Sequence, residues 1–348
     1  MFETDLFGWG NENSKPQEKY YKPAPEMSRP VPDPFPLLSR NPPPKQSLLR
    51  APKANRPPRK HYPEQTPLFV GFTRNWPQLL QCVVSYIAAG WPPEDIYVVE
   101  NTGVMFANQN GNLTLQNPFY LNHTQLGMLG VNVIITPTLL TFSQLQNFYL
   151  WTALARSLPY FFWTHEDLVV FTYENDTTPH PSIAPPTLYD NAVSTLRHLT
   201  NPANQLKWAH HFFAYDHLTL VNRDAVLSVG GWDTHIPFYA SDCDTYVRLM
   251  WAGWSQGESD IGLIYDVGSV MEDVKQRGGQ GEPFYRDADG FEKGVKMLID
   301  TGRAVFAEKW GHRGCDIANV GIKGGDAWRL ERDWDEQTEG LGYEGKSW

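Results

Sequence analysis

Three consecutive polar residues, His165-Glu166-Asp167, follow a short aromatic run at 160–163 and could bind a metal ion. In an extended chain, residues two apart point to the same side, so His165 and Asp167 should face one direction and Glu166 the other. A converging imidazole and carboxylate are suitable ligands for Mn²⁺ or Mg²⁺. The alternative is that the three residues cap the next turn and are merely solvated, and their spacing alone favours that reading.

A second acidic cluster, Ser241-Asp242-Cys243-Asp244, stands at the start of a helix predicted over 241–252. Ser241 and Asp244 have the spacing of a capping box, which gives Asp244 a structural role. Asp242 has no such local partner, and a carboxylate in the first helical turn could accept a proton from an acceptor hydroxyl. The alternative is that Asp242 only pairs with the helix dipole.

The elements that must position these clusters follow from hydrophobic periodicity. Short apolar runs bounded by turn residues predict buried strands, and apolar positions at helical spacing predict helices between them. Thr141 and Gln144 have capping-box spacing, so a helix should begin there. The predicted strands are 67–72, 96–99, 131–136 and 160–163, and the predicted helices are 77–89 and 141–157.

This order of elements predicts an α/β fold: an open, mixed and mostly parallel sheet with helices on both faces. In such sheets ligands bind at the carboxyl ends of strands. Two polar clusters, Glu100-Asn101 and His165-Glu166-Asp167, follow strands and should lie at that edge. The second half adds predicted strands at 218–221 and 261–265 and predicted helices at 223–229, 241–252 and 291–301.

The charge of the chain limits its partners. The formal net charge is −10, and residues 1–62 carry more Lys and Arg than Asp and Glu, so the remainder is more acidic still. An acidic domain argues against a nucleic-acid partner. A carboxylate about 5 Å from a phosphate charge costs roughly 3 kcal/mol at an effective dielectric near 20. A nucleotide diphosphate bound beside these carboxylates would therefore need a metal ion between them.

The order of the polar motifs resembles that of a known superfamily. The motifs are Val99-Glu100-Asn101, Asn147, His165-Glu166-Asp167, Gly230-Gly231-Trp232-Asp233 and Ser241-Asp242-Cys243-Asp244 with Arg248. They resemble the GT-A-fold glycosyltransferases, especially family-2-like members of the nucleotide-diphospho-sugar transferase superfamily. The resemblance covers about residues 66–275, with a further similar stretch at 306–311. His165 replaces the first Asp of the usual Asp-x-Asp motif, and Ser241 replaces a Glu.

The resemblance implies a metal-dependent glycosyltransferase that moves a sugar from a nucleotide-diphospho-sugar donor to a hydroxyl of a glycan or glycoprotein acceptor. The transfer would invert the configuration of the sugar. By the same resemblance Asp242 is the general base. Asp167, with help from His165, would bind Mn²⁺ or Mg²⁺ and through it the diphosphate.

Further site residues complete this expectation. His312 is a candidate for a third metal ligand, with Glu272 and Asp273 as competitors for that place. It could equally be a surface histidine. The residues expected to contact the donor nucleotide are Glu100, Asn101, Arg74 and Glu166.

The chain should have two parts. Residues 1–62 are rich in Pro and charged residues, which predicts a disordered, semi-extended arm or stem, either solvated or used as a docking peptide. Residues 63–348 should form a single GT-A-like catalytic domain, with a nucleotide-binding half at 63–170 and an acceptor half at 171–348. The sequence has no run of about 18 apolar residues, so no membrane span is expected.

The location of the protein is indicated only weakly by its sequence. Sequons at Asn112, Asn122 and Asn175 and a Pro-rich arm suit a stem in the secretory pathway, in the Golgi lumen; otherwise the protein would be soluble. Three cysteines are too few and too widely spaced for a disulfide framework, and their odd number leaves at least one thiol unpaired. These cysteines are Cys82, Cys243 and Cys315.

Two other function classes fit parts of the sequence. The altered acidic motifs could belong to a non-catalytic GT-A-like protein that binds a nucleotide or a glycan. A nucleotidyltransferase would share this type of sheet, but it normally has a Gly-rich loop with Lys or Arg after its first strand. The segment 71–76 has only one Gly and one Arg, which supports that class poorly.

Overall fold

The computed structural model describes residues 64–173, 186–267 and 290–332. Contacts divide the chain into residues 1–51 and 52–348, and every described residue belongs to the second unit. The predicted arm at 1–62, the sequon at Asn175 and the candidate metal ligands Glu272 and Asp273 lie outside the described residues.

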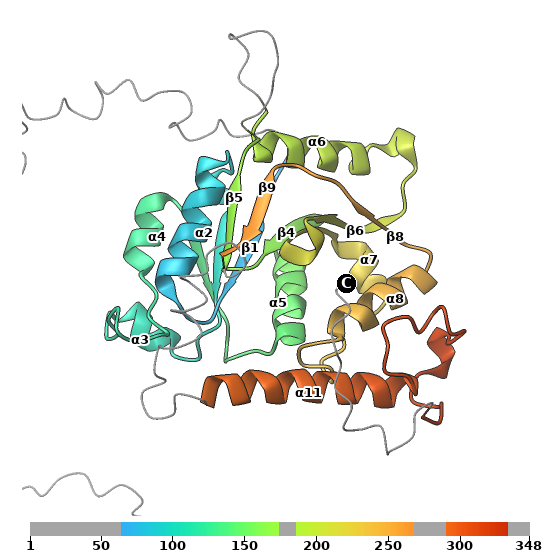
Figure 1. Ribbon diagram of the computed structural model, residues 1–348. Coiled ribbons are helices and arrows are strands. Elements are labelled where there is room, and N and C mark those ends of the chain that lie inside the picture. Colours follow the sequence, from blue (N-terminus) through green and yellow to red (C-terminus); the bar gives the residue numbers. More distant parts are fainter. Residues whose placement is uncertain (1–63, 174–185, 268–289, 333–348) are drawn as a thin grey trace, which may run out of the picture. The chain divides into compact units, whose positions relative to one another are not determined.

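A seven-stranded sheet in the order β3-β2-β1-β4-β7-β6-β8 forms the centre of the domain (Figure 1). Strands β1 to β4 are mutually parallel, β7 runs antiparallel to β4 and β6, and β8 is parallel to β6. The predicted mixed, mostly parallel sheet is confirmed. The strands are β1 (Leu68–Phe72), β2 (Ile96–Glu100), β3 (Asn132–Ile135), β4 (Tyr160–Thr164), β6 (Trp208–Phe213), β7 (Leu218–Asn222) and β8 (Ser255–Glu258).

Alternation along the strands builds two cores, one on each face of the sheet. On β1, Leu68 and Val70 belong to one buried cluster and Phe69 to the other, as the two-residue period of a strand requires. Helices α2 (Trp76–Ala88), α4 (His123–Leu129) and α6 (Leu188–Thr200) contribute to the first cluster. Helices α5 (Phe142–Ala155) and α7 (Arg223–Ser228) contribute to the second.

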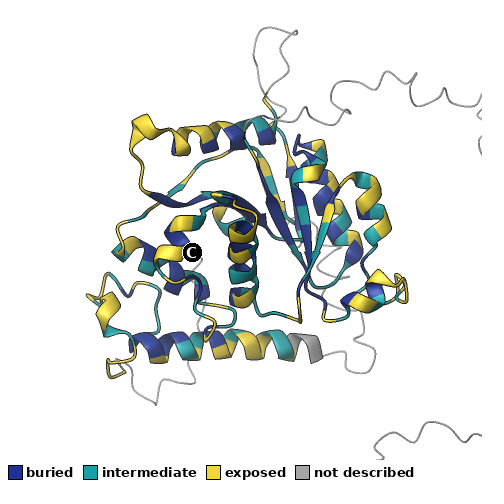
Figure 2. Ribbon diagram, turned by 180° about the vertical axis from the view of Figure 1, so that it is seen from behind, coloured by how far each residue is buried: buried dark blue, intermediate teal, exposed yellow. Residues whose placement is uncertain are grey.

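A third layer is formed by α8 (Ser241–Trp251) and the long α11 (Gly290–Trp310). Val247, Phe306 and Trp310 join these two helices in a separate buried cluster. Figure 2 shows the buried residues of α11 in its C-terminal half, where this packing lies. A small antiparallel sheet, β5 (Leu168–Phe171) with β9 (Leu263–Asp266), continues the chain directly after Asp167. The remaining short elements are α3 (Met105–Gln109) and the 3₁₀ turns η3 (Pro93–Asp95), η4 (Pro202–Asn204), η5 (Tyr215–His217) and η6 (Gly324–Asp326).

The structure differs from the sequence-based expectation in several elements. Strands β5, β6 and β8 and helices α3, α4 and α6 were not predicted, and α11 continues nine residues beyond the predicted end at 301. Gly302 lies inside α11, where a Cβ would overlap the backbone oxygen of Tyr239. The glycine therefore permits a close approach between α11 and the loop at Tyr239. None of the helices described here is both long enough and apolar enough to cross a bilayer.

Candidate active site

Asp167, just past the end of β4, and Asp242, at the start of α8, line the same cavity of about 350 Å³. The two acidic clusters of the sequence, 75 residues apart, thus meet in one site. Carboxylates, imidazoles and guanidinium groups all contribute to the lining. The Asp, His and Arg residues of the lining are His165, Asp167, Asp216, His217, Asp242, Asp266, Arg303 and Arg313.

The alternation predicted for His165-Glu166-Asp167 is present. His165 and Asp167 both line the cavity, with 4.0 Å between His165 Nδ1 and Asp167 Oδ1. Glu166 points elsewhere, and its Oε2 accepts a hydrogen bond from the backbone nitrogen of Thr73 at 3.3 Å. Burial raises the pKa of Glu166 well above its ordinary value, the charge of Asp167 adds to this rise, and Arg74 opposes it. Glu166 and Arg74 are thus close neighbours at the end of β1, outside the cavity lining.

The pair formed by His165 and Asp167 fits a metal ion that is shared with a phosphate ligand. The side chains are 35% and 43% exposed, and among the described residues the buried Nε2 of His165 has no hydrogen-bond partner. The described residues contain no group of three side chains that could enclose a metal ion. Mg²⁺-like ions are commonly held by one or two carboxylates plus substrate phosphates rather than by a protein cage. The donor set matches that second kind of site.

His312, the predicted third ligand, does not line this cavity. Its Nε2 lies 2.9 Å from Oδ1 of Asp316, four residues later in the sequence. This hydrogen bond lowers the pKa of Asp316. His312 therefore has a partner that accounts for its position, and its role as a metal ligand stays a prediction.

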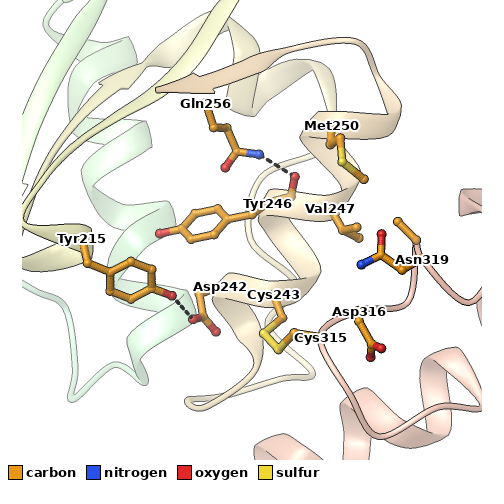
Figure 3. A pocket seen from close by; sticks show the side chains of 11 residues that line it. Tyr215, Asp242, Cys243, Tyr246, Val247, Met250, Gln256, Cys315, Asp316 and Asn319 are labelled. Atoms are coloured by element: carbon orange, nitrogen blue, oxygen red, sulfur yellow. Dashed lines mark hydrogen bonds between the residues drawn. A yellow bond between two sulfur atoms is a disulfide. The ribbon is translucent and has the colours of Figure 1, made fainter. Parts of the chain in front are cut away.

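Asp242 is half-buried and faces the cavity from the first turn of α8 (Figure 3). The hydroxyl of Tyr215 donates a hydrogen bond to Asp242 Oδ2 at 3.4 Å. Burial raises the pKa of Asp242, and the negative charge of Asp216 adds to the rise. Burial also raises the pKa of Tyr215, so its hydroxyl stays protonated. Asp242 is consequently a stronger base than an ordinary aspartate and is held by a neutral donor.

The backbone around Asp242 adopts conformations that are rare outside glycine. Ala214 and Tyr215 have φ values of 59° and 56°, and Ala240, which precedes α8, has a φ of 69°. Non-glycine residues in the left-handed region store strain, and such residues concentrate at functional sites. Tyr215 and Ala240 both line the cavity.

The capping box predicted for Ser241 and Asp244 is wrong. Ala240 is the N-cap residue, and Ser241 is already inside the helix, because the left-handed turn at Ala240 places the helix start one residue earlier. Asp244 does have a structural role, through other partners. Its fully buried carboxylate contacts Arg248 Nε at 2.8 Å, Lys309 Nζ at 2.5 Å and Trp310 Nε1 at 3.0 Å.

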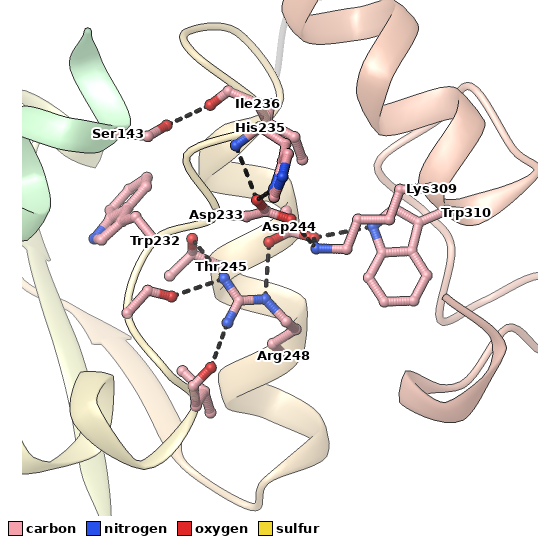
Figure 4. Close-up of polar contacts among 12 residues, drawn as sticks. Ser143, Trp232, Asp233, His235, Ile236, Asp244, Thr245, Arg248, Lys309 and Trp310 are labelled. Atoms are coloured by element: carbon pink, nitrogen blue, oxygen red, sulfur yellow. Dashed lines mark hydrogen bonds and ion pairs between the residues drawn. The ribbon is translucent and has the colours of Figure 1, made fainter. Parts of the chain in front are cut away.

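These contacts belong to a polar network that fastens α11 to α8 (Figure 4). Lys309 Nζ also lies 2.6 Å from Asp233 Oδ2, and Arg248 donates to the backbone oxygens of Val229 and Gly231 at 2.6 and 2.9 Å. Burial opposes ionisation of Asp233, but the bonds from Lys309 and His235 outweigh it and lower the pKa to about 2. Three of the motif residues after 230, namely Asp233, Asp244 and Arg248, therefore hold the domain together through ion pairs and hydrogen bonds.

The loop that carries Trp232 is fixed from the other side by α5. Asn147 Oδ1 accepts a bond from the backbone nitrogen of Trp232, and Asn147 Nδ2 donates to the oxygen of Trp232, each at 2.9 Å. Gly231 has a φ of 78°, and a Cβ there would come within 2.7 Å of Asn147 Oδ1. Asn147 and Gly231 are thus matched in shape, which explains two further motif residues structurally.

Glu100 and Asn101 are held in internal hydrogen bonds and do not line the cavity. Glu100 is fully buried and accepts from Asn108 Nδ2 at 2.7 Å and Thr102 Oγ1 at 3.0 Å, and its other oxygen is 2.7 Å from His123 Nε2. The side chain of Asn101 bonds the backbone nitrogen and oxygen of Leu140. Their predicted contact with a nucleotide stays a prediction, and these bonds give both residues a structural role.

Several lining residues were missed by the sequence analysis. Asp216 and His217 follow β6, so they carry the same strand-end signal as Glu100-Asn101, but β6 itself was not predicted. Arg303 and Arg313 have no local signal, because only the docking of α11 brings them to the cavity.

A disulfide was also missed. Cys243 and Cys315, 72 residues apart in sequence, are joined with 5.4 Å between their Cα atoms, and both line the cavity. The odd thiol that was predicted to remain unpaired is Cys82, which is buried.

Comparison with known proteins yields structural neighbours at low similarity. No protein-family model matches the chain, and no curated protein matches it. A mannosyltransferase from Pyrobaculum calidifontis, solved with GDP-Man and Mn²⁺, has a TM-score of 0.36 and 12% identity; the match covers 60% of this chain and 57% of the mannosyltransferase. A cytidylyltransferase from Leptospira borgpetersenii has a TM-score of 0.34 and 11% identity over 68% of this chain and 96% of its own. These values describe a distant likeness of shape to two nucleotide-using transferases.

Proposed function

We propose that this chain is a metal-dependent glycosyltransferase that moves a sugar from a nucleotide-diphospho-sugar to an acceptor hydroxyl with inversion at the anomeric carbon. The observation that carries the proposal is the shared cavity of Asp167 and Asp242. One acidic group would serve the metal and the other the proton, and the cavity between them would hold the sugar.

The donor diphosphate is assigned to the part of the cavity that contains Arg303 and Arg313. Guanidinium groups are the side chains best suited to bind phosphate oxygens in pairs. The Arg303 guanidinium carbon lies 5.4 Å from the centre of the Tyr239 ring, and Tyr239 lines the same cavity. His165 and Asp167 would hold a Mn²⁺ or Mg²⁺ ion, which when bound neutralises charge on the diphosphate leaving group.

Asp242 would act as the general base. The acceptor O–H gives its proton to a carboxylate oxygen of Asp242, and the acceptor oxygen forms a bond to the anomeric carbon. The bond from that carbon to the diphosphate breaks, and the nucleoside diphosphate leaves with the electron pair. The raised pKa of Asp242 suits this role, because a more basic carboxylate takes the proton more readily near neutral pH.

The sugar itself would meet an aromatic wall. Phe142, Phe238 and Tyr239 line the same cavity. Aromatic rings offer apolar area to the C–H faces of a sugar ring, and few directional polar groups then fix its orientation.

Two substitutions and a matched control test the assignment. We expect Asp242→Asn to lower the rate of sugar transfer, or of donor hydrolysis, by about 10²–10⁴-fold, because the general base is lost. Its affinity for the nucleotide should be unchanged. We expect Asp167→Ala to weaken Mn²⁺-dependent binding of nucleoside diphosphates by roughly tenfold or more, about 1.4 kcal/mol. Asp300→Asn, in an exposed pair with Lys296 on α11, is the control and should change neither quantity.

The measurements are calorimetric titration of UDP, GDP, CDP and ADP with MnCl₂ or EDTA, and nucleotide release from the matching sugar donors. A nucleotide affinity that is the same with EDTA as with MnCl₂ would contradict the metal assignment. Undiminished turnover by Asp242→Asn would contradict the base. Tight nucleotide binding with no turnover for any donor would identify a non-catalytic binding protein instead.

We further propose that the protein resides in an oxidising compartment of the secretory pathway. A disulfide between distant residues such as Cys243 and Cys315 persists mainly in oxidising compartments. Asn112, the first sequon residue, is exposed, whereas the side chain of Asn122 accepts a hydrogen bond from the backbone nitrogen of Gln125 and caps α4.

A further inference from the structure

A second cavity, of about 310 Å³, adjoins the first at Asp242, and Figure 3 shows the residues that line it. Four residues line both cavities: Tyr215, Asp242, Cys243 and Cys315. The disulfide and the hydrogen bond from Tyr215 to Asp242 thus lie where the two cavities adjoin. Asp242 lines both cavities, so a group in either one can be next to it.

The two cavities differ in their cationic groups. Arg303 and Arg313 line the first cavity, together with the carboxylates of Asp167, Asp216, Asp242 and Asp266. The described residues that line the second include no Lys, Arg or His, and its charged groups are the carboxylates of Asp242 and Asp316, of which Asp316 is hydrogen-bonded to His312 Nε2. Guanidinium groups for a diphosphate are therefore supplied by the first lining and not by the second, where an anion would meet carboxylates alone. This difference assigns different ligands to the two cavities.

The polar groups of the second cavity are suited to hydroxyls. Gln256, from β8, donates to the backbone oxygen of Tyr246 at 2.8 Å, which fixes the orientation of its amide. Among the described residues, the buried hydroxyl of Tyr246 has no hydrogen-bond partner. Asn319 adds a second amide on the opposite side (Figure 3). Amide and phenol groups both donate and accept, as recognition of sugar hydroxyls requires.

Apolar side chains complete this lining. Val247, Met250 and Ala318 contribute aliphatic surface next to the polar groups. Pockets for small ligands usually have roughly 300–1,000 Å³, so this cavity is at the small end of that range. Its size suits one ring rather than an extended chain.

We propose that the second cavity binds the acceptor as a single uncharged sugar ring, with Asp242 facing the hydroxyl that attacks, and that Asp316 excludes anionic sugars. The proposal rests on the proposed glycosyltransferase function. It adds the position of the acceptor, its charge class and the residue that selects it.

The test uses a pair of neighbouring substitutions. Asn319→Tyr fills the cavity from an exposed position where folding tolerates a larger side chain. Val320→Tyr is the matched control, because Val320 is 51% exposed and lines neither cavity. Binding of methyl glucoside, methyl galactoside, methyl mannoside and the anionic methyl glucuronide is followed by saturation-transfer NMR on the full chain with MnCl₂ and a nucleoside diphosphate.

We expect at least one neutral methyl glycoside to bind, and methyl glucuronide to bind several times more weakly. Asn319→Tyr should weaken the neutral sugar by about tenfold or more and leave nucleoside diphosphate affinity unchanged, because that nucleotide occupies the other cavity. Val320→Tyr should bind like the wild type. Asp316→Asn should reduce the difference in binding affinity between the neutral glycosides and methyl glucuronide.

Two results would overturn the proposal: sugar binding that is insensitive to Asn319→Tyr, or methyl glucuronide bound as well as the neutral glycosides by the wild type. Failure of the proposed function looks different. In that case nucleoside diphosphates do not bind or donors are not turned over, while the effect of Asn319→Tyr on sugar binding is still measured and decides the cavity's occupant.

Discussion

Asp242 and Asp244 stand two residues apart on α8 and have opposite environments. Asp244 is fully buried and is neutralised by Lys309 and Arg248. Asp242 faces a cavity, and in the described part of the chain its side-chain partner is the neutral Tyr215. Asp244 is thus fully occupied in joining α8 to α11, whereas the carboxylate of Asp242 faces the space that a ligand could fill. The environment therefore separates a structural acid from a candidate catalytic one.

His210 is the residue with the clearest pH-dependent cost. It is 1% exposed on β6, and neither ring nitrogen has a partner among the described residues. Burial lowers the pKa of His210 to about 3. The unfolded chain, with a histidine pKa near 6.5, binds this proton more readily. The resulting stability is complete above about pH 6.5 and is lost as the pH falls towards 3.

We therefore expect the wild type to lose about 2 kcal/mol of unfolding free energy from this group between pH 7.5 and 5.0. His210→Phe keeps an aromatic ring beside Phe212 and Tyr246 and should remove that part of the loss. Urea unfolding at both pH values measures it. His198 is exposed, so His198→Gln is the control and should lose as much unfolding free energy between the two pH values as the wild type. An equal loss in His210→Phe would contradict the assignment.

At the same scale, some site residues could be predicted from sequence and others could not. Asp242 was identifiable because no local partner explained it, and His165 with Asp167 because strand alternation is strictly local. Arg303 and Asp266 were not, since their position depends on α11 docking and on β5 pairing with β9 nearly a hundred residues later. Long-range pairings leave no periodic mark in a single sequence.

Among the elements, α11 adds Arg303 to the first cavity and is fastened to α8 beside it. Its last turn carries Lys309 and Trp310, which bind the acidic residues of α8 and the preceding loop, and its middle carries Arg303. The sequence predicted a helix here, but only to 301, and no pattern indicated which surface it would cover. The strands with continuous apolar runs, by contrast, were predicted within one or two residues, because full burial leaves a direct compositional signal.

Lys309 provides the test of this docking. It is 6% exposed and lies between Asp233 and Asp244. We expect Lys309→Met to lower the unfolding free energy by about 3–5 kcal/mol, because two carboxylates lose their buried cation. Lys296→Met, in an exposed ion pair on the same helix, should cost less than about 0.5 kcal/mol. Urea unfolding that does not distinguish these two variants would contradict the proposed role of the network.

At the scale of the whole domain, the disulfide between Cys243 and Cys315 joins two residues that are 72 positions apart in the sequence. A crosslink that closes a loop of this length lowers the conformational entropy of the unfolded chain, which stabilises the folded domain by about 4 kcal/mol. We expect Cys243→Ser with Cys315→Ser to lower Tm by on the order of 10 °C. Dithiothreitol should do the same to the wild type and to Cys82→Ala, but not to the double variant. A double variant that melts like the wild type would show that the crosslink does not stabilise the domain.

The lining of the first cavity comes from stretches of chain between Phe142 and Cys315, none of which forms a pocket by itself. A polypeptide released before α11 would lack Arg303, Arg313 and the crosslink to Cys315. Ligand recognition therefore depends on the docking of α11 onto α8. We expect recognition to be lost first when α11 separates from α8, before the sheet itself comes apart.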